Sequence, residues 1–317
     1  MSFKVNKLAA FLVLLLVSCT ATKNTAYNQP QLSSTQEIIF TEVQKSTLQY
    51  FTHGAEPVSG LARERFHVDG IYPQNDKMVV TSGGTGFGVM ALIVGMERGF
   101  ITREDGVARL EKIVGFLETA DRFHGAWPHW WNGETGKVKP FSKRDDGGDL
   151  VETSFLIQGL LCVRQYFANG NDGEKSLAAR IDKLWKEVEF DWYRNGKNIL
   201  FWHWSPNYAW QMNNQVKGYN ECLIMYVLAA SSPTHSIPAE VYHEGWARNG
   251  KIKDTVTAYS YQLTLAHDGA PKYGGPLFWA HYSFLGLDPR GLSDRYADYW
   301  QHNTNHTLIN YSWCVDN

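Results

Sequence analysis

Residues 83–99 have the sequence GGTGFGVMALIVGMERG, and this stretch decides the fold class. Nearly every position is apolar or glycine, which predicts a helix that is buried on most of its sides. No Lys-Ser or Lys-Thr pair follows the glycines, so the stretch lacks the residues of a phosphate-binding loop. We interpret the glycines as places where a second helix packs closely.

Apolar residues recur at helical spacing along most of the remaining chain. Between residues 35 and 53 they are Ile38, Ile39, Val43, Leu48 and Phe51. Further helices are expected over residues 102–117, 149–168 and 174–190, and shorter ones over 219–231, 238–249, 275–285 and 293–312. The sequence therefore predicts an all-α protein.

Two aromatic segments, residues 125–141 and 192–204, connect these helices. Each contains an Asn-Gly pair, at 132–133 and 195–196, flanked by aromatic and aliphatic residues. They are predicted to form short β-hairpins that project from a helical scaffold. Helices paired in series, with functional loops at one end, indicate an α/α toroid, although no internal sequence repeat adds to this argument.

The N-terminal residues are typical of an export signal. Lys4 and Lys7 form a basic start, residues 8–17 are apolar but too few to span a bilayer, and a serine directly precedes Cys19. We expect residues 1–18 to be a signal peptide, Cys19 to be lipidated, and residues 19–34 to be a flexible tether. The protein would then be an exported lipoprotein of the outer membrane, with one domain over residues 35–317. The alternative is a signal peptide with an incidental cysteine.

Composition and missing motifs argue against several classes of function. The net charge is −2 and the 30 basic residues are scattered, so the sequence does not favour nucleic acid as a partner. There is no HExxH, no GxSxG and no Cys/His group with zinc spacing, so neither a metal nor a cofactor is expected. The 12 Trp, 16 Tyr and 16 Phe residues are more than a core of this size needs.

Glycosidic bonds are cleaved by two carboxyl groups, one protonated beside the leaving oxygen and one ionised. The densest group of carboxylates is in residues 144–153, RDDGGDLVET. Asp149 and Glu152 are three residues apart, so both side chains would lie on one side of the first turn of a helix. The same spacing is typical of an N-terminal cap, and Asp145 with Asp146 also fits a solvated turn.

Glu221 is the complementary candidate. It precedes an apolar helix in residues 216–226, VKGYNECLIMY. Desolvation at that place would raise the pKa of Glu221 toward the range of a general acid. The alternative is a buried glutamate paired with Lys217 or Arg248.

Aromatic rings match the apolar faces of sugar rings, while His, Asn and Arg side chains bind the hydroxyl groups. Each tryptophan taken alone fits a core position, whereas several tryptophans in polar loops beside carboxylates favour a sugar-binding cleft. The predicted sugar-binding residues are Trp127, His129, Trp130, Trp131, Arg144, Trp202, His203, Trp204, Tyr208 and Trp210.

Five segments resemble a known family when taken in order. They are residues 144–153, 205–211 (SPNYAWQ), 218–221 (GYNE), 243–246 (HEGW) and 294–300 (DRYADYW). Together they resemble the glucoamylase-like family of bacterial lipoproteins, which includes the β-1,2-glucanases of glycoside hydrolase family 144. The resemblance runs from about residue 35 to the last residue.

The resemblance implies an (α/α)6 toroid, as in six-hairpin glycosidases, and inverting hydrolysis of β-1,2-glucan without a metal. It marks Asp145, Asp149, Glu152 and Glu221 as the acidic site. We expect Glu221 to be the general acid and Asp145 the base, with Asp149 or Glu152 as alternative bases.

Members of this family continue past the residues that match 314–317 here. The resemblance therefore implies a toroid that is incomplete at its C-terminus, with a base or a substrate wall beyond residue 317. We expect endo action on a β-glucan. The alternatives are an exo-acting or differently linked β-glucan hydrolase, and a non-catalytic glycan-binding lipoprotein.

Overall fold

The computed structural model describes residues 31–267, 270 and 272–317. The predicted signal peptide and the lipidation site Cys19 lie outside these residues, as does most of the predicted tether. The chain divides into two compact units, Met1–Thr41 and Glu42–Asn317. Within the described part, no helix combines the length and the hydropathy that a membrane crossing requires.

The first helix, α1 (Ser34–Thr52), has the position that the sequence predicted. Leu48 is buried, whereas Ile38, Ile39 and Val43 are exposed. Helical spacing of apolar residues therefore predicted the element correctly, but it did not predict a buried face along the whole helix. The described part of the first unit, residues 31–41, consists of the start of this helix and the residues before it.

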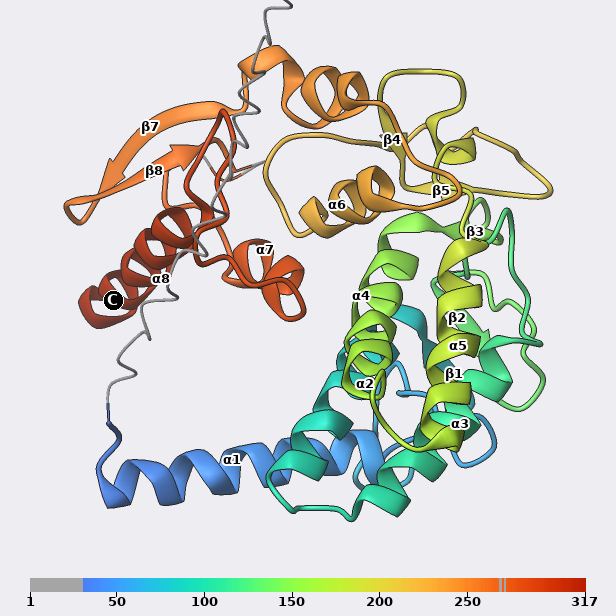
Figure 1. Ribbon diagram of the computed structural model, residues 1–317. Coiled ribbons are helices and arrows are strands. Elements are labelled where there is room, and N and C mark those ends of the chain that lie inside the picture. The colour runs from blue at the N-terminus through green and yellow to red at the C-terminus, as the bar shows by residue number, and fades with distance from the viewer. Residues whose placement is uncertain (1–30, 268–269, 271) are drawn as a thin grey trace, which may run out of the picture. The chain divides into compact units, whose positions relative to one another are not determined.

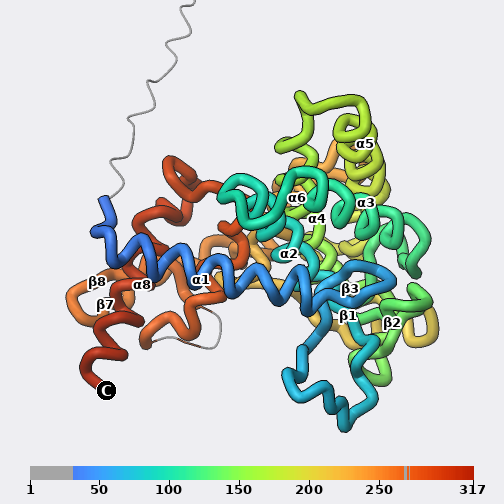
Figure 2. The backbone as a smooth tube through the Cα atoms, turned by 90° about the horizontal axis from the view of Figure 1, so that it is seen from below, coloured from blue at the N-terminus to red at the C-terminus, as the bar shows by residue number. Residues whose placement is uncertain are grey.

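Helices α2 (Ser82–Glu97) and α4 (Leu150–Tyr166) form the central pair of the second unit and lie side by side in both views (Figures 1 and 2). Their backbones approach closely at glycines. A Cβ atom added at Gly86 would lie 2.2 Å from the Phe155 carbonyl oxygen, and one at Gly159 would lie 2.1 Å from the Gly86 carbonyl oxygen. The interpretation of the glycine-rich stretch as a packing surface is confirmed.

Two amphipathic helices pack on this pair. They are α3 (Arg103–Leu117) and α5 (Asp172–Lys186), which contact each other as well as α2 and α4 respectively. Asn171 caps α5 with its side chain, and Glu174 returns a hydrogen bond to the Asn171 backbone, so the start of this helix is fixed locally. Apolar side chains such as Leu110 and Ile181 are fully buried. The mostly helical prediction is confirmed for this half of the unit.

The helices of the C-terminal half are shorter than predicted. They are α6 (Leu223–Ser231), the π-helix η2 (Val241–Trp246), the 3-10 helix η3 (Arg248–Gly250), α7 (Phe278–His281), the 3-10 helix η4 (Tyr282–Phe284) and α8 (Tyr299–Asp316). A further 3-10 helix, η1, covers Trp192–Arg194. The last helix begins at residue 299 because the Asp298 side chain accepts the Gln301 N–H at 2.9 Å and caps it there.

The strands form two-stranded antiparallel sheets. The pairs are β1 (Val79–Thr81) with β2 (Trp130–Asn132), β3 (Gly148–Asp149) with β5 (His203–Trp204), β4 (Leu200–Phe201) with β6 (Gln215–Val216), and β7 (Lys253–Ala258) with β8 (Tyr261–Leu265). The hairpin predicted within residues 125–141 is partly present, since Trp131 bridges Val138. The hairpin predicted within residues 192–204 is wrong, because β4 and β5 each pair with a distant segment.

Candidate active site

The carboxylate segment is positioned by the short sheet of β3 and β5, which aligns Asp149 with His203. Glycines make this approach possible. A Cβ atom added at Gly147 would lie 2.2 Å from the Trp204 carbonyl oxygen, and one at Gly148 would lie 1.9 Å from the Tyr193 hydroxyl. The segment therefore passes through a space that only glycine fits, and it then enters α4.

Asp149 is the fully buried centre of the cluster. Its Oδ1 accepts the Glu152 N–H at 2.9 Å, which caps α4. Its Oδ2 accepts the Trp202 Nε1–H at 3.0 Å and lies 3.1 Å from Nδ1 of His129. Burial alone would raise the pKa of Asp149, but hydrogen bonds from His129 and His203 outweigh it and hold that pKa below its usual range.

These contacts correct the expectation that Asp149 is an alternative base. Its exposed fraction is 0 %, and both of its oxygens accept hydrogen bonds from the protein. A general base must reach the water from which it takes a proton, and Asp149 has no surface for such a contact. The capping alternative is confirmed, and Asp149 orients the groups around it.

Two histidines neutralise the carboxylates. Nε2 of His203 lies 3.2 Å from Oδ2 of Asp145 and 3.5 Å from Oδ2 of Asp149. Burial would lower the pKa of both His129 and His203, but the neighbouring carboxylates raise each to about 9. Both imidazoles are therefore cationic at neutral pH, and the cluster pairs two carboxylates with two cations.

His129, Asp145 and Asp149 offer ligand atoms within 4.8 Å of one another, a spacing at which they could hold a metal ion. A metal needs neutral histidine and free carboxylate oxygens as ligands. Here the pKa of His129 is raised to about 9, and Oδ2 of Asp149 already accepts a Trp202 hydrogen bond. The arrangement fits a hydrogen-bonded ion cluster better than a metal centre.

Glu152 is half-buried in the first turn of α4. One of its carboxyl oxygens accepts the Gly83 N–H at 3.1 Å, from the start of α2. Burial raises the pKa of Glu152 to about 7, and the charges of Asp149 and Glu221 add to this effect while His129 and Gly83 oppose it. At pH 7 about half of the Glu152 side chains therefore carry the proton, which suits a proton donor more than the base that the sequence suggested.

Glu221 is half-buried in the turn that directly precedes α6. Its charge acts on Glu152 and on the Tyr282 phenol, raising the pKa of both groups. Helix α6 contacts α4, so Glu221 and Glu152 lie at the starts of neighbouring helices, although about 70 residues of sequence separate them. The placement of Glu221 at the head of an apolar helix agrees with the sequence prediction.

The other acidic residues of the segment have different surroundings. Asp145 is 5 % exposed and lies beside His203. Asp146 accepts hydrogen bonds from the Ser205 hydroxyl and from Nδ2 of Asn207, the latter at 2.7 Å. Asp146 thus fastens the loop that follows β5, whereas Arg144 is exposed.

The predicted sugar-binding aromatics separate into two groups. Trp127 and Trp131 are fully buried, and their Nε1–H groups donate to the carbonyl oxygens of Leu117 and Asp121. For these two the prediction is wrong, because a core indole presents no ring face to a sugar. The half-buried members are His129, Trp130, Trp202, Trp204, Tyr208 and Trp210. His203 is buried and stacks on Trp202, with ring centroids 5.7 Å apart.

Some residues of the site were missed from the sequence. The Tyr282 ring packs against Phe87 and Phe278, with centroid distances of 4.8 and 5.2 Å, and its phenol is influenced by Glu152 and Glu221. Ser283 is buried beside the Glu221 backbone. Both lie in an ordinary helical pattern, and only the tertiary fold brings them to the carboxyls.

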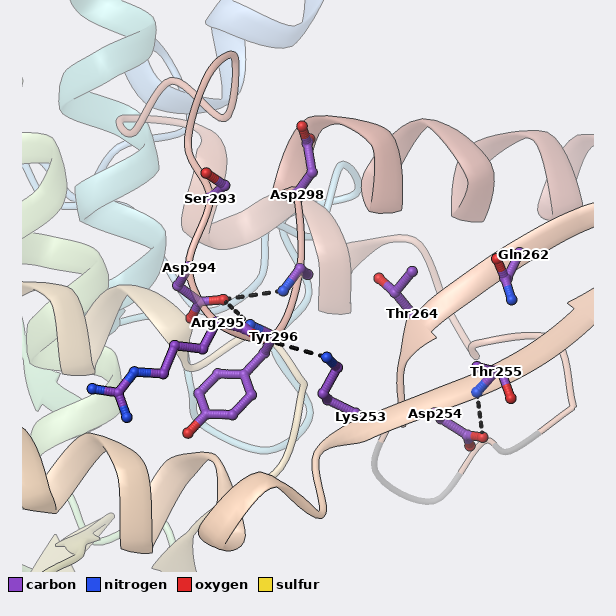
Figure 3. A pocket seen from close by; sticks show the side chains of 11 residues that line it. Lys253, Asp254, Thr255, Gln262, Thr264, Ser293, Asp294, Arg295, Tyr296 and Asp298 are labelled. Atoms are coloured by element: carbon purple, nitrogen blue, oxygen red, sulfur yellow. Dashed lines mark hydrogen bonds between the residues drawn. The ribbon is translucent and has the colours of Figure 1, made fainter.

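A pocket of about 570 Å³ lies elsewhere, beside the β7–β8 hairpin and the loop before α8 (Figure 3). Asp294 in its wall accepts hydrogen bonds from the Tyr242 and Tyr299 hydroxyls at 2.6 and 3.0 Å. It also accepts the backbone N–H groups of Tyr296 and Ala297. The pocket is lined by none of the predicted site residues, and its central carboxylate serves to hold the loop.

Several known proteins are similar to this chain. The glycoamylase family model matches residues 213–317. The structure of an endo-β-1,2-glucanase from Chitinophaga pinensis, solved with sophorotriose and glucose, is 72% identical with a TM-score of 0.88. The match covers 90% of this chain and 68% of that one. A β-1,2-glucanase structure from Parabacteroides distasonis is 42% identical with a TM-score of 0.81, over 90% of this chain and 42% of that one.

A curated relative from Parabacteroides distasonis is an exo β-1,2-glucooligosaccharide sophorohydrolase acting at the non-reducing end. The alignment is 45% identical over a length of 303 positions and covers 89% of this chain. The chain spans only 40% of that relative's length. These similarities place the chain in the glucoamylase-like family that contains the endo-β-1,2-glucanases of glycoside hydrolase family 144.

Proposed function

We propose that the chain is the glucan-cleaving part of an endo-acting, inverting β-1,2-glucanase. The observation that carries the proposal is the placement of Glu152 and Glu221 at the starts of the contacting helices α4 and α6, where the charge of Glu221 raises the pKa of Glu152. The 72% identity to an endo-β-1,2-glucanase supports β-1,2-glucan as the substrate class.

In this proposal Glu221 protonates the glycosidic oxygen, and Asp145 takes a proton from the attacking water. His203 lies 3.2 Å from Asp145 and holds that carboxylate in place. Inversion requires room for a water between the base and the sugar, which corresponds to carboxyl separations of about 6.5–9.5 Å in inverting enzymes. In its protonated form, Glu152 donates a hydrogen bond beside the acid.

A second assignment exchanges the roles of the two glutamates. It is favoured by the pKa of Glu152, which burial raises to about 7, a value suited to a general acid that works near neutral pH. Glu221 would then be the ionised partner. The alkaline limb of the pH–rate profile reports the ionisation of the general acid. Glu221→Gln should therefore remove this limb if Glu221 is the acid, and Glu152→Gln should remove it if Glu152 is the acid.

The test uses linear β-1,2-glucan and the purified protein with Glu221→Gln, Glu152→Gln and Asp145→Asn. Glu240→Gln, an exposed glutamate between α6 and η2, is the matched control. We expect the control to keep its rate and Glu221→Gln to lose turnover at least about 10²-fold while it still binds the glucan. Wild-type protein that binds the glucan without releasing new reducing ends would instead indicate a glycan-binding lipoprotein.

The product pattern separates endo from exo action. A ladder of oligosaccharides early in the reaction supports endo cleavage, whereas one small product supports the exo action named for the Parabacteroides distasonis sophorohydrolase. A parallel screen of β-1,3-, β-1,4- and α-glucans tests the linkage. Faster cleavage of any of these than of β-1,2-glucan would contradict the proposed substrate class.

The sugar contacts are part of the same proposal. We assign them to the half-buried aromatic residues of the site and to the exposed Arg144. Trp130 is well placed, because it contacts Phe141 and His129 with ring centroids 4.7 and 5.7 Å apart. Trp130→Ala should weaken glucan binding.

Two further proposals concern architecture and location. We propose that α2, α4 and α6 belong to the inner ring of an (α/α)6 toroid and that α3 and α5 belong to its outer ring, which the contacts of α4 with α2, α5 and α6 support. We also propose that the protein is exported and lipidated at Cys19, on the sequence pattern alone. Loss of membrane association in Cys19→Ala would support the anchor.

A further inference from the structure

Helix α6 begins without help from its own capping residue. The N-cap position is Cys222, whose side chain makes no capping hydrogen bond. The N–H groups of a first helical turn have no acceptor within the helix, so a buried start needs one from elsewhere. This helix start matters because Glu221 lies in the turn directly before it.

Ser283 supplies the missing acceptor from another segment. Its hydroxyl oxygen accepts the Ile224 N–H at 3.0 Å, and the same hydroxyl donates to the Glu221 carbonyl oxygen at 2.6 Å. Ser283 is 1 % exposed, so its side chain has little contact with solvent. One side chain therefore fixes both the backbone of the candidate acid and the first turn of the helix behind it.

The segment that carries Ser283 is itself attached to the helix that carries Glu152. Gln158 lies six residues after Glu152 on α4, and its Nε2 donates to the Tyr282 carbonyl oxygen at 3.0 Å. The Tyr282 ring packs against Phe87 of α2 and Phe155 of α4, with centroid distances of 4.8 and 5.7 Å. Residues 282–283 are thus held by α2 and α4 on one side and by the Glu221 turn on the other.

We propose that Ser283 is the positioning residue that sets the place of Glu221 relative to Glu152. The inference deepens the proposed function and rests on it, since positioning matters only if these carboxyls act on a glycosidic bond. Ser283 does not touch the sugar in this proposal. It acts through the Glu221 backbone, and Gln158 anchors it to α4.

The experiment compares Ser283→Ala with Ser232→Ala. Ser232 is a matched control because it is also buried, accepts a backbone N–H from His235 at 3.1 Å, and lies at the opposite end of α6. Both variants should lose similar thermal stability. We expect Ser283→Ala to lower kcat about 10- to 100-fold with KM changed less than about twofold, because a misplaced acid affects the chemical step more than ground-state binding.

If Ser283 had a purely structural role, Ser283→Ala would lower thermal stability without lowering kcat relative to KM. The inference is overturned if kcat of Ser283→Ala stays within about twofold of Ser232→Ala. The alkaline limb of the pH–rate profile should move in Ser283→Ala and stay in place in Ser232→Ala, and Ser283→Thr, which keeps the hydroxyl, should restore it.

A second variant covers the case in which Ser283→Ala does not fold. Gln158→Leu removes the anchor on α4 and keeps Ser283 itself, and we expect the same fall in kcat at nearly constant KM. A Gln158→Leu rate equal to that of Ser232→Ala would overturn the inference. Failure of the proposed function has a different signature, because the wild-type protein would then release no new reducing ends from linear β-1,2-glucan.

Discussion

Replacing Asp149 with Asn tests the electrostatic account of the ion cluster. Asn keeps an acceptor oxygen for the Glu152 N–H, so the helix cap survives while the charge is lost. The pKa of His129 is raised from 6.5 to about 9, which corresponds to about 2–3 kcal/mol of stabilisation at pH 7. We expect Asp149→Asn to lose at least this amount in urea denaturation at pH 7.

The pH dependence provides the sharper test. The folded protein binds the His129 proton more tightly than the unfolded chain does, so the stabilisation is complete below pH 6.5 and is lost as the pH rises through about 9. The free-energy difference between wild type and Asp149→Asn should therefore shrink between pH 7 and pH 9. His203, whose pKa is raised in the same way, would add to this effect.

The control for this prediction is Asp288→Asn, which removes a carboxylate from an exposed ion pair with Arg290. Solvent screens that pair, so its loss should change the unfolding free energy far less, and equally at both pH values. The reasoning is refuted if Asp149→Asn and wild type differ by the same unfolding free energy at pH 7 and pH 9.

Three other predictions each concern a single residue. Gly83→Ala should lower activity at least about 10-fold, because the new Cβ atom would lie 2.2 Å from the Glu152 carboxylate. Gly115→Ala is the control and should leave activity unchanged, because the nearest atom to its Cβ is a side-chain atom at 3.6 Å. Burial lowers the pKa of His302 to about 2. Below pH 6.5 the unfolded chain gains a proton at this residue while the folded protein does not, so acidification lowers the free energy of unfolding. His302→Gln should therefore flatten the decline in unfolding temperature from pH 6.5 to pH 4. Trp131→Ala should cost about 3–5 kcal/mol in urea denaturation, as expected for a fully buried indole.

The helices were predictable where the pattern is local and strong. Residues 83–99 predict a buried helix because almost every position is apolar or glycine, and glycines within this stretch contact α4. Strand pairing was less predictable. The hairpin β7–β8 turns at Tyr259 and Ser260, both at positive φ, where sequence analysis looks for Asn or Gly. The Asn-Gly pair at 195–196 does form a left-handed turn, but β4 pairs with β6 instead.

The candidate site was predictable in part for the same reason. Asp145, Asp149 and Glu152 lie within one short segment, so any fold keeps them near one another. Which aromatic residues belong to the site and which belong to the core depended on burial, which the sequence did not predict. Trp130 and Trp131 are adjacent in the same polar loop, yet one is half-buried and the other belongs to the core. Ser283 was invisible in the sequence because its role comes from tertiary contact with the Glu221 turn.

The most direct test of the central claim is a crystal structure of the Glu221→Gln protein with a linear β-1,2-gluco-oligosaccharide bound. The account predicts a glycosidic oxygen within hydrogen-bonding distance, about 3 Å, of the residue 221 side chain, with the Glu152 carboxyl on the same sugar. An oligosaccharide bound only in the pocket of Figure 3, or with every glycosidic oxygen beyond the reach of residue 221, would contradict it.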